Sequence, residues 1–545
     1  MAEVECLFIL VLVVAGMLAV STAADPTPPK FTASYHSSGV LHLPYAELDE
    51  PFQIFYDVDN KRSRVDFYNG LDTVYLFENK TGFEYGVSYS ISPETVTDEV
   101  KTGCFQVNGT NSVTISIQSF IPDVSDFKYV GKDIANNVQV DVWKNVTEVG
   151  KKTNTYTFMV SQTQPPRPVR YEMIGYDTLI GSHYDRYYVD YYVYSTKPID
   201  DFQFDLPKGL KCGSFPGPGI EHHIATNPHQ EIFSPDKGDR YNKFYESYKD
   251  LHGKRYSDDE EHSKRQATFK HNVRFIHSTN RKHLGYKVEV NHLADLFDEE
   301  LRNMRGRLYT PGNNNGLPYD GFPGLLPTSM DWRIMGAVSQ VKDQATCGSC
   351  WSFGTTGTIE GAYFLKTGKM VRLSQQNLMD CSWKHGNNGC DGGEEWRSYE
   401  WIMEKGGLEA ESTYGPYLGQ NGKCHFNSSN AVIQISKYYN ITSGSQEALK
   451  SAIAKIGPIS VGIDAAHKSL SYYSSGVYYE PKCGNKPEDL DHAVLAVGYG
   501  KLNNEHYWLI KNSWSTNWGN NGYVLINQQD NNCGVTTDAT YVTLK

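Results

Sequence analysis

Ten cysteines are distributed unevenly along the 545 residues, and seven of them lie between residues 326 and 545. Cys6 begins an apolar run over 6–20. That run is shorter than the roughly 20 residues of a membrane span and is typical of the core of a secretory signal peptide. We therefore expect a signal peptide at 1–24 and a mature chain in an oxidising compartment, where disulfides persist. Removal of Cys6 leaves an odd number of cysteines, so at least one thiol stays free or links two chains.

Composition excludes several classes of protein. The net charge is −12 and no run of five basic residues occurs, which argues against a nucleic-acid partner. Aromatic residues make up 13% of the chain, so it is not a disordered protein. We expect no metal and no cofactor, because there is no His-Glu-x-x-His motif and the cysteines do not form paired C-x-x-C units. We also expect no membrane span.

The region 25–225 is rich in tyrosine and predicts β structure. Residues 113–117, 138–142 and 187–194 alternate with a period of two, which favours short strands of an antiparallel sheet or barrel. Residues 52–70 resemble the opening hairpin of ependymin-like and lipoprotein-carrier folds. No group of residues suited to catalysis occurs here, so we expect an accessory domain.

Glycine and proline mark the next boundaries. The run at 216–219 cannot continue a helix or a central strand. Residues 236–305 are charged and helical in pattern, and a second run rich in Gly, Pro and Asn follows. We therefore expect a helical domain at 236–305, an exposed linker at 306–325 that proteases cut, and a last domain at 326–545.

Six residues in the helical region are spaced by 4, 4, 3, 4 and 4 positions, which places them within about 100° on one helix face. They are Glu261, Arg265, Phe269, Asn272, Ile276 and Asn280. The set resembles the propeptide signature of cathepsin L-like proteases of the papain family. Residues 291–295 resemble the second propeptide motif, with Leu293 where the family has Phe. The resemblance implies an inhibitor of the chain's own protease, whose tail crosses the cleft in the reverse direction to substrate and which acid loosens.

The segment 344–351 carries the strongest motif of the chain. Cys350 precedes a helix-like segment at 351–366, and the positive end of a helix lowers the pKa of a thiol. The segment resembles the nucleophile segment of the papain family, although Ala345 stands where the family commonly has Gly. Other segments resemble those that bear the base and its orienting amide. The resemblance implies these roles: nucleophile Cys350, base His492, orienting amide Asn512, oxyanion donor Gln344 and water shield Trp514.

These roles imply peptide-bond hydrolysis by acyl transfer. Cys350 and His492 would form a thiolate–imidazolium pair, and the thiolate would attack the scissile carbonyl. Gln344 and the backbone N–H of Cys350 would stabilise the oxyanion, each by about 3–4 kcal/mol. His492 would protonate the leaving amine, and water would hydrolyse the thioester.

Two alternatives remain open. Cys347 and Cys350 match a thioredoxin-like C-x-x-C motif, which would make the chain a thiol oxidoreductase. That reading is weakened because Trp351 follows the second cysteine instead of preceding the first, and because no βαβ pattern lies upstream. The other alternative is a secreted binding or carrier protein with an inactive protease half, although all four expected catalytic residues are present.

The family pattern implies three disulfides and leaves one further pair. The implied bridges are Cys347–Cys390, Cys381–Cys424 and Cys483–Cys533, so Cys104 and Cys212 remain to pair within the β region. Each bridge adds about 2–4 kcal/mol. Cys350 would be the free thiol.

The resemblance also implies a substrate cleft. Gly392 and Gly393 would hydrogen-bond the substrate backbone, and Glu394, Glu395, Gly462, Leu490 and Asp538 would surround the S2 pocket. Carboxylates at its floor and mouth predict that it accepts Arg or Lys at P2 as well as Leu or Phe. Alternatively, the two glutamates face solvent, as most charges do. The other expected substrate-binding residues are Gly348, Asp491 and Trp514.

We expect an α+β fold: a papain-like catalytic domain with a helical L domain and a β-barrel-like R domain, a helical inhibitory propeptide, and a separate, mostly antiparallel β domain before them. This order resembles two-chain proteases of the family from insect haemocytes, which implies cleavage in the middle and retention of the N-terminal chain. Protein and peptide substrates follow, in a lysosome, an acidic granule or outside the cell. Glycosylation sequons occur at Asn79, Asn108, Asn145, Asn427 and Asn440.

Overall fold

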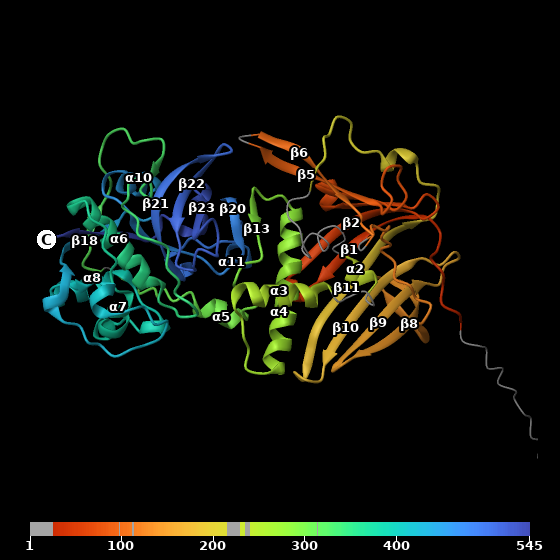
Figure 1. The fold of residues 1–545 in the computed structure, drawn as a ribbon, viewed down its shortest axis with the longest axis horizontal. Coiled ribbons are helices and arrows are strands. Elements are labelled where there is room, and N and C mark those ends of the chain that lie inside the picture. Colours follow the sequence, from red (N-terminus) through yellow and green to blue (C-terminus); the bar gives the residue numbers. More distant parts are fainter. Residues whose placement is uncertain (1–25, 97–98, 112–113, 215–228, 235–239, 313) are drawn as a thin grey trace, which may run out of the picture.

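The computed structural model describes residues 26–545 except 97–98, 112–113, 215–228, 235–239 and 313. The expected signal peptide lies outside the described residues. Figure 1 shows a sheet domain at one end, the peptidase at the other, and the propeptide helices between them. Within the described ranges, no helix is both long and apolar enough to cross a membrane.

Twelve strands of the N-terminal region form one sheet, and the expected antiparallel β domain is confirmed. The order is β12-β6-β5-β4-β3-β2-β1-β11-β10-β9-β8-β7, with only the β12–β6 pair parallel. The expected strands at 138–142 and 187–194 lie within β8 and β11. The bounds are β1 (Tyr35–Leu43), β2 (Leu48–Asp57), β3 (Arg62–Phe67), β4 (Asp72–Phe77), β5 (Val87–Val96), β6 (Glu99–Asn108), β7 (Lys128–Ala135), β8 (Val138–Val149), β9 (Lys152–Ser161), β10 (Pro168–Asp177), β11 (Ser182–Ser195) and β12 (Gly213–Ser214).

The expected strand at 113–117 is wrong for the described residues 114–117. The N–H of Ile115 donates to the carbonyl of Tyr85 at 2.9 Å, but these residues form no strand, and side chains bind the backbone that follows. Residues 114–119 lie outside any strand. The hydroxyl of Tyr35 accepts the N–H of Phe120 at 2.8 Å, and the hydroxyl of Ser63 accepts the N–H of Gln118 at 3.3 Å. Hydroxyl partners satisfy buried amides as well as a strand ladder does, so alternation alone misled the prediction.

One face of the sheet carries the core of the N-terminal domain. The short helix α2 (Gln230–Phe233) packs against this face, with the ring of Phe233 4.7 Å from that of Phe120. The carbonyl of Ile232 accepts hydrogen bonds of 3.3 Å from the hydroxyls of Tyr171 and Tyr187. Buried apolar side chains on the same face include Phe52, Ile54, Tyr171 and Val189.

The propeptide follows, with α3 (Arg240–His252), α4 (Asp259–Arg281), β13 (Tyr286–Val288) and α5 (Asp298–Asn303). The guanidinium of Arg265 on α4 donates to both carboxylate oxygens of Glu300 at 2.9 Å. Asn272 donates to a backbone carbonyl in the loop before α5, and Asn280 bonds both the N–H and the C=O of Val288. The signature face of α4 therefore fixes β13 and α5.

The peptidase has the expected two lobes, and strands of the pro-segment extend its sheet. The sheet order is β13-β20-β23-β22-β21-β19-β24-β18-β14. The propeptide strand β13 pairs antiparallel with β20, and β14 (Leu317–Tyr319) pairs parallel with β18. The helical lobe contains α6 (Cys350–Thr367), α7 (Gln375–Cys381), α8 (Glu395–Lys405) and α9 (Glu411–Tyr414). The remaining elements are β15 (Met330–Asp331), β16 (Leu408–Glu409), β17 (Ala431–Ile433), β18 (Ile435–Ile441), α10 (Gln446–Lys455), β19 (Ile459–Ile463), α11 (Lys468–Ser471), β20 (Tyr473–Tyr478), β21 (His492–Leu502), β22 (Glu505–Lys511), β23 (Tyr523–Asn527) and β24 (Ala539–Leu544).

The expected linker at 306–325 is only partly exposed. Arg307 and Tyr319 are buried, at 6% and 7% exposure. Residues 322–325 are exposed, and the exposed fraction of Leu325 is 98%. The segment is therefore exposed in part, because it first follows the cleft and then joins a sheet edge.

The disulfides join the pairs that the sequence analysis expected. The S–S distances are 1.99 Å for Cys104–Cys212, 2.11 Å for Cys347–Cys390, 2.13 Å for Cys381–Cys424 and 2.04 Å for Cys483–Cys533. Cys350 is the free cysteine of the described residues.

Helix α4 presents its opposite face to the strand ends of the N-terminal sheet. Arg274 donates to Asp185 at 2.8 and 3.1 Å and to Glu231 of α2 at 2.9 Å. Lys270 lies 2.8 Å from Glu231 and 3.3 Å from Asp185. The side chain of Asp185 is fully buried, so these cations compensate its charge in place of water.

A second ion-pair group lies further along α4. Arg281 donates to Glu50 of β2 at 2.5 Å, and His229 bonds the other carboxylate oxygen at 2.8 Å. The side chain of Glu50 is 1% exposed. The neighbouring Arg281 and His229 hold the pKa of Glu50 well below its usual range even though burial raises it. Removal of one partner from such a buried pair costs about 3–5 kcal/mol, because it leaves an uncompensated charge.

The interface between α4 and the sheet should weaken in acid. Burial lowers the pKa of His271 to about 4 although Asp185 opposes this, and Arg274 and Lys270 lower it further. A pKa below the usual 6.5 means that the contribution of neutral His271 is complete above pH 6.5 and is lost as the pH falls toward 4. The lowered pKa of Asp185 acts in the same direction below about pH 4. We expect the Tm of the Cys350→Ala chain to decrease between pH 7 and pH 4.

The free energy of unfolding of a His271→Gln variant should fall less between pH 6.5 and 4 than that of the parent chain, by about 1–3 kcal/mol, because the titrating imidazole is absent. The control is His183→Gln, because His183 is exposed and its ring only touches Tyr176 edge-on. Equal pH profiles for His271→Gln and the parent chain would contradict the prediction.

Candidate active site

The candidate nucleophile lies at the start of the central helix of the helical lobe. Cys350 is the first residue of α6, with Ser349 at the N-cap, and its side chain is fully buried. His492 is the first residue of β21, and its Nε2 lies 2.8 Å from Oδ1 of Asn512, which follows β22. The ring of Trp514 lies 4.8 Å from that of His492 and is 2% exposed, so it shields the His492–Asn512 bond from water.

Gln344 already has a partner for its amide. Its Nε2 donates to the carbonyl of Met304 in the propeptide at 2.7 Å and to that of Cys347 at 2.8 Å. Ser513 donates to its Oε1 at 2.6 Å, which fixes the orientation of the amide. A propeptide carbonyl therefore takes the donor that the sequence analysis assigned to a substrate oxyanion.

The propeptide tail crosses the cleft with its backbone in a parallel bridge to Gly393. Gly393 donates to the carbonyl of Gly306 and accepts from the N–H of Leu308, both at 2.9 Å. A Cβ on Gly306 would lie 1.9 Å from the carbonyl oxygen of Gly348, and one on Gly392 would lie 2.8 Å from the carbonyl oxygen of Gly306. Glycine at these positions lets two backbones meet beside the thiol.

The covered site favours a neutral thiol and a neutral imidazole. Burial raises the pKa of Cys350 to about 12, although hydrogen bonds from the backbone of Ala493 and Gly306 oppose it. Burial lowers the pKa of His492 to about 4, although its bond to Asn512 opposes this. The thiolate–imidazolium pair of the sequence analysis is therefore not favoured while the propeptide covers the cleft.

The predicted S2 pocket holds a side chain of the propeptide. The guanidinium of Arg307 lies 2.5 Å from a carboxylate oxygen of Asp538 and 3.5 Å from one of Glu395. A Cβ on Gly462 would lie 2.9 Å from this guanidinium and 3.2 Å from Leu490. Four of the five expected pocket residues are therefore brought together around a cation.

Glu394, the fifth, faces another way. It accepts hydrogen bonds from the N–H and hydroxyl of Thr310, at 3.0 and 2.6 Å, and from Arg397 at 2.7 Å. Both Glu394 and Glu395 are buried, at 2% and 4% exposure, so the alternative that they face solvent is wrong in this form.

Asp491 anchors the tail on the other side of the cleft. Its carboxylate accepts from Nε of Arg305 at 2.7 Å and from the N–H of Ala465 at 2.9 Å. Its carbonyl accepts the N–H of Arg307 at 2.9 Å. Three consecutive residues, 305–307, are therefore fixed at the candidate catalytic centre.

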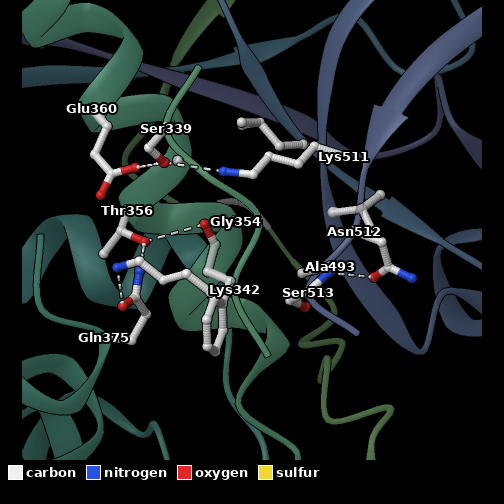
Figure 2. Close-up of a pocket in the computed structure, with 14 residues that line it drawn as sticks. Ser339, Lys342, Gly354, Thr356, Glu360, Gln375, Ala493, Lys511, Asn512 and Ser513 are labelled. Carbon is white, nitrogen blue, oxygen red and sulfur yellow. Dashed lines mark hydrogen bonds between the residues drawn. The ribbon is translucent and has the colours of Figure 1, made fainter. Parts of the chain in front are cut away.

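A polar layer lies behind this centre, between the two lobes (Figure 2). Lys511 donates to Ser339 at 3.0 Å, and Ser339 donates to Glu360 of α6 at 2.5 Å. The layer surrounds a cavity of about 20 Å³ that also borders Asn512, which is large enough for about one water molecule. These bonds fix the strand before Asn512 against α6.

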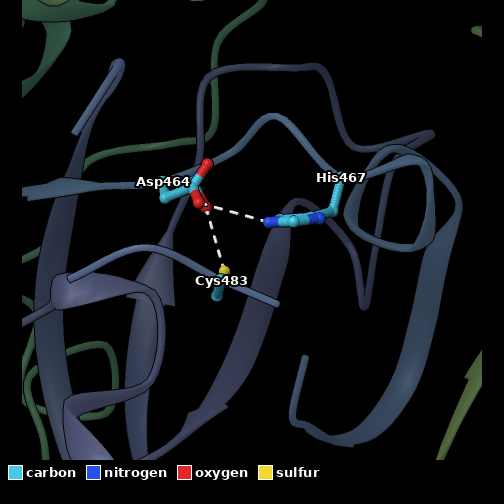
Figure 3. Close-up of side chains that lie close together, drawn as sticks. All are labelled: Asp464, His467 and Cys483. Carbon is cyan, nitrogen blue, oxygen red and sulfur yellow. Dashed lines mark hydrogen bonds and ion pairs between the residues drawn. The ribbon is translucent and has the colours of Figure 1, made fainter. Parts of the chain in front are cut away.

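Asp464, His467 and Cys483 also lie together (Figure 3), with one ligand-type atom of each within 4.8 Å of the others. The sulfur of Cys483 is bonded to Cys533, and Asp464 accepts from the N–H of Gly484 at 2.7 Å. A disulfide sulfur is not a thiolate ligand, so this group supports a loop and does not form a metal site.

Cys347 is bonded to Cys390, so the C-x-x-C pair is not a dithiol and the oxidoreductase alternative lacks its reactive group. Ala345 has a φ of 53°, a left-handed conformation that costs a residue with a Cβ about 1–2 kcal/mol. This explains why Gly suits the position where the family pattern has it. Of the sequon residues, Asn79, Asn108 and Asn427 are exposed, while Asn145 and Asn440 are half-buried.

Sequence analysis missed the residues by which the propeptide blocks the site. They are the carbonyl of Met304, Arg305, Gly306 and Arg307. The available signal was the Arg-Gly-Arg run directly after the propeptide helices. Its two cations match the carboxylates that sequence analysis had placed around the cleft.

The fold and site define a cysteine protease with its inhibitory propeptide in place. Residues 326–543 match the papain family cysteine protease, and residues 245–301 match the cathepsin propeptide inhibitor domain (I29). The chain belongs to the papain family of cysteine proteases and is a zymogen of the cathepsin L-like type.

Relatives agree over the same half of the chain. Digestive cysteine proteinase 2 of Homarus americanus is 42% identical over 54% of this chain and 93% of its own length. Procathepsin L of Rattus norvegicus is 41% identical over 57% of this chain and 94% of its own. The solved digestive procathepsin L 3 of Tenebrio molitor is 39% identical over 56% of this chain and 99% of its own, with a TM-score of 0.52.

Alkylation of Cys350 tests how completely the tail covers the thiol. At pH 7, iodoacetamide should modify Cys350 in the intact chain at least about 100-fold more slowly than after removal of the propeptide, because the thiol is buried and its pKa is raised. In Gly306→Ala the added Cβ should displace the tail and speed the reaction, which peptide mass spectrometry measures.

Leu325→Ala is the control, because that side chain is 98% exposed. The prediction is wrong if Gly306→Ala reacts as slowly as the parent chain or if Leu325→Ala reacts faster.

Proposed function

We propose that this chain is a cysteine endopeptidase zymogen that hydrolyses peptide bonds with Cys350 as nucleophile, His492 as base and Asn512 as its orienting residue. The observation that carries the proposal is the 2.8 Å bond from His492 to Asn512 beside the free thiol at the start of α6. Nδ1 of His492 is buried and has no hydrogen-bond partner, so it is free to take the thiol proton.

The charge states would change when the propeptide leaves. Water and substrate then reach the cleft, the desolvation that raises the pKa of Cys350 is relieved, and the positive end of α6 favours the thiolate. The thiolate attacks the scissile carbonyl, and Gln344, released from Met304, donates to the oxyanion together with the N–H of Cys350. His492 gives its proton to the leaving amine, and water completes hydrolysis of the thioester.

The S2 subsite would accept Arg and Lys at P2 as well as Leu and Phe. The support is Arg307, whose guanidinium fits beside Asp538 and Glu395 with room provided by Gly462. The propeptide runs opposite to the expected direction of a substrate, but a cationic side chain meets the same carboxylates from either direction. Leu490 supplies an apolar wall for the other residues.

We place the protein in the secretory pathway, in a lysosome, an acidic granule or outside the cell. Four disulfides and three exposed sequon residues support this. Its substrates would be proteins and peptides, its own propeptide is the inhibitor, and cleavage at the exposed residues 322–325 would leave an N-terminal chain that is retained.

Turnover of peptide substrates after acid treatment at pH 4–6 tests the proposal. Cys350→Ala should have no thiol-dependent turnover, and Gln344→Ala should lower kcat/KM by about 100- to 1000-fold through loss of an oxyanion donor. Wild-type protein without thiol-dependent turnover at any pH between 4 and 7 would overturn the proposal.

A P2 series of peptides tests the pocket. Asp538→Asn should lower kcat/KM for P2 Arg about tenfold, a modest effect because the Asp538 side chain is 37% exposed, and should leave P2 Leu unchanged. Glu394→Gln is the matched control, because its carboxylate contacts Thr310 and Arg397 and not Arg307. The subsite assignment fails if P2 Arg is not cleaved or if both variants change the P2 profile equally.

A further inference from the structure

Helix α4 of the inhibitory propeptide is covered on two sides. Only one of these sides packs against parts of the chain that match the protease family. The family matches cover 245–301 and 326–543, which lie outside the N-terminal sheet domain. Helix α4 lies between that sheet and the rest of the zymogen (Figure 1). Its sheet-facing surface is therefore a feature that this chain adds to a cathepsin-type propeptide.

The contacts follow most of the helix. Ser263 near its start donates to Asp177 of β10 at 2.8 Å, and the hydroxyls of Ser278 and Tyr68 lie 2.6 Å apart. Between Ser263 and Arg281 the helix spans about 27 Å at 1.5 Å per residue. The buried groups around Asp185 and Glu50 lie within this length.

The sheet surface that contacts α4 carries buried carboxylates that pair with cations of the helix. Asp185 and Glu50 have side chains that are 0% and 1% exposed, and both find their compensating cations on α4. Without the helix, these two carboxylates of the sheet would lose their charged partners Arg274 and Arg281. The surface thus has charge complementarity to one occupant, the propeptide helix.

The sheet domain makes few direct polar contacts with the peptidase. Among the described residues, the one hydrogen bond or ion pair that joins them directly is Lys468 with Glu47, at 3.5 Å, and the Glu47 side chain is 73% exposed. Such an exposed pair contributes little stability. The propeptide, in contrast, adds β13 to the peptidase sheet and occupies the cleft through Arg305 and Arg307.

We propose that the N-terminal sheet is a binding domain for the propeptide helix and that the sheet, the propeptide and its tail as far as Leu308 act as one inhibitor. After the linker is cut, the N-terminal chain stays on the peptidase through its propeptide, so the two-chain complex is the inhibited form. Activity requires the whole unit to leave or the propeptide to be destroyed. This inference rests on the proposed function for its consequence but not for the binding surface itself.

Hydrogen exchange of the full-length Cys350→Ala chain tests the binding surface without any need for activity. In Asp185→Asn, which touches no peptidase residue, exchange in residues 259–281 should rise at least tenfold, because Arg274 keeps only Glu231 of its two charged partners and Lys270 also loses Asp185. Asp201→Asn is the matched control, since Asp201 pairs with Arg62 of the same domain but is 88% exposed. If Asp185→Asn does not fold, Tyr68→Phe should give a smaller rise at the end of α4.

A second experiment tests the inhibited complex. Thermolysin, which cuts before exposed Leu and Phe, should nick the wild-type chain at 322–325. Gel filtration at pH 7 should then recover both chains in one complex. This complex should have at least tenfold less turnover than the peptidase isolated after acid dissociation. The Asp185→Asn complex should retain more turnover than the Asp201→Asn complex. Unchanged exchange in α4 of folded Asp185→Asn, or nicked chains that separate at pH 7, would overturn the inference. An inactive isolated peptidase would instead overturn the proposed function and leave the exchange result standing.

Discussion

The burial of helix α4 on two sides is the constraint on which this zymogen depends. A helix with so many charged residues is stable only if each buried charge has a partner, since an uncompensated buried charge costs several kcal/mol. Arg265 finds Glu300 on one side, and Arg274 finds Asp185 on the other. Glu300 belongs to the propeptide and Asp185 to the sheet domain, so the helix fixes these two parts to each other, and strand β13 and the tail join them to the peptidase.

The same arrangement places the tail over the candidate nucleophile. Gly306 brings a backbone against the thiol, so no water solvates a thiolate and burial raises the pKa of Cys350. The carbonyl of Met304 meanwhile occupies the amide of Gln344. Under the proposed mechanism, the tail thus keeps the candidate nucleophile neutral and occupies the proposed oxyanion donor without altering either residue, and its departure would free both.

Short, chemically demanding motifs made the peptidase and propeptide predictable from sequence. The spacing of the α4 signature and the segment around Cys350 fix local contacts, so a few residues identify them. The sheet-facing side of α4 was not predictable, because Arg281 and Glu50 meet only through the tertiary fold and lie far apart in the sequence. The failed strand at 113–117 has the same cause, since hydroxyls of distant strands satisfy the backbone that follows it.

The proposed S2 pocket would connect specificity with inhibition. Asp538 and Glu395 hold Arg307 in the zymogen, and the same carboxylates would recognise a basic P2 residue of a substrate. A change that removes this charge would therefore weaken the binding of the tail as well as the proposed preference for cationic substrates. Conversely, a substrate with Arg at P2 would compete for the site that Arg307 occupies. If the Arg307 side chain left the pocket, the two backbone hydrogen bonds at Gly393, the Arg305–Asp491 pair and the bond from Gln344 to Met304 would still hold the tail over the thiol.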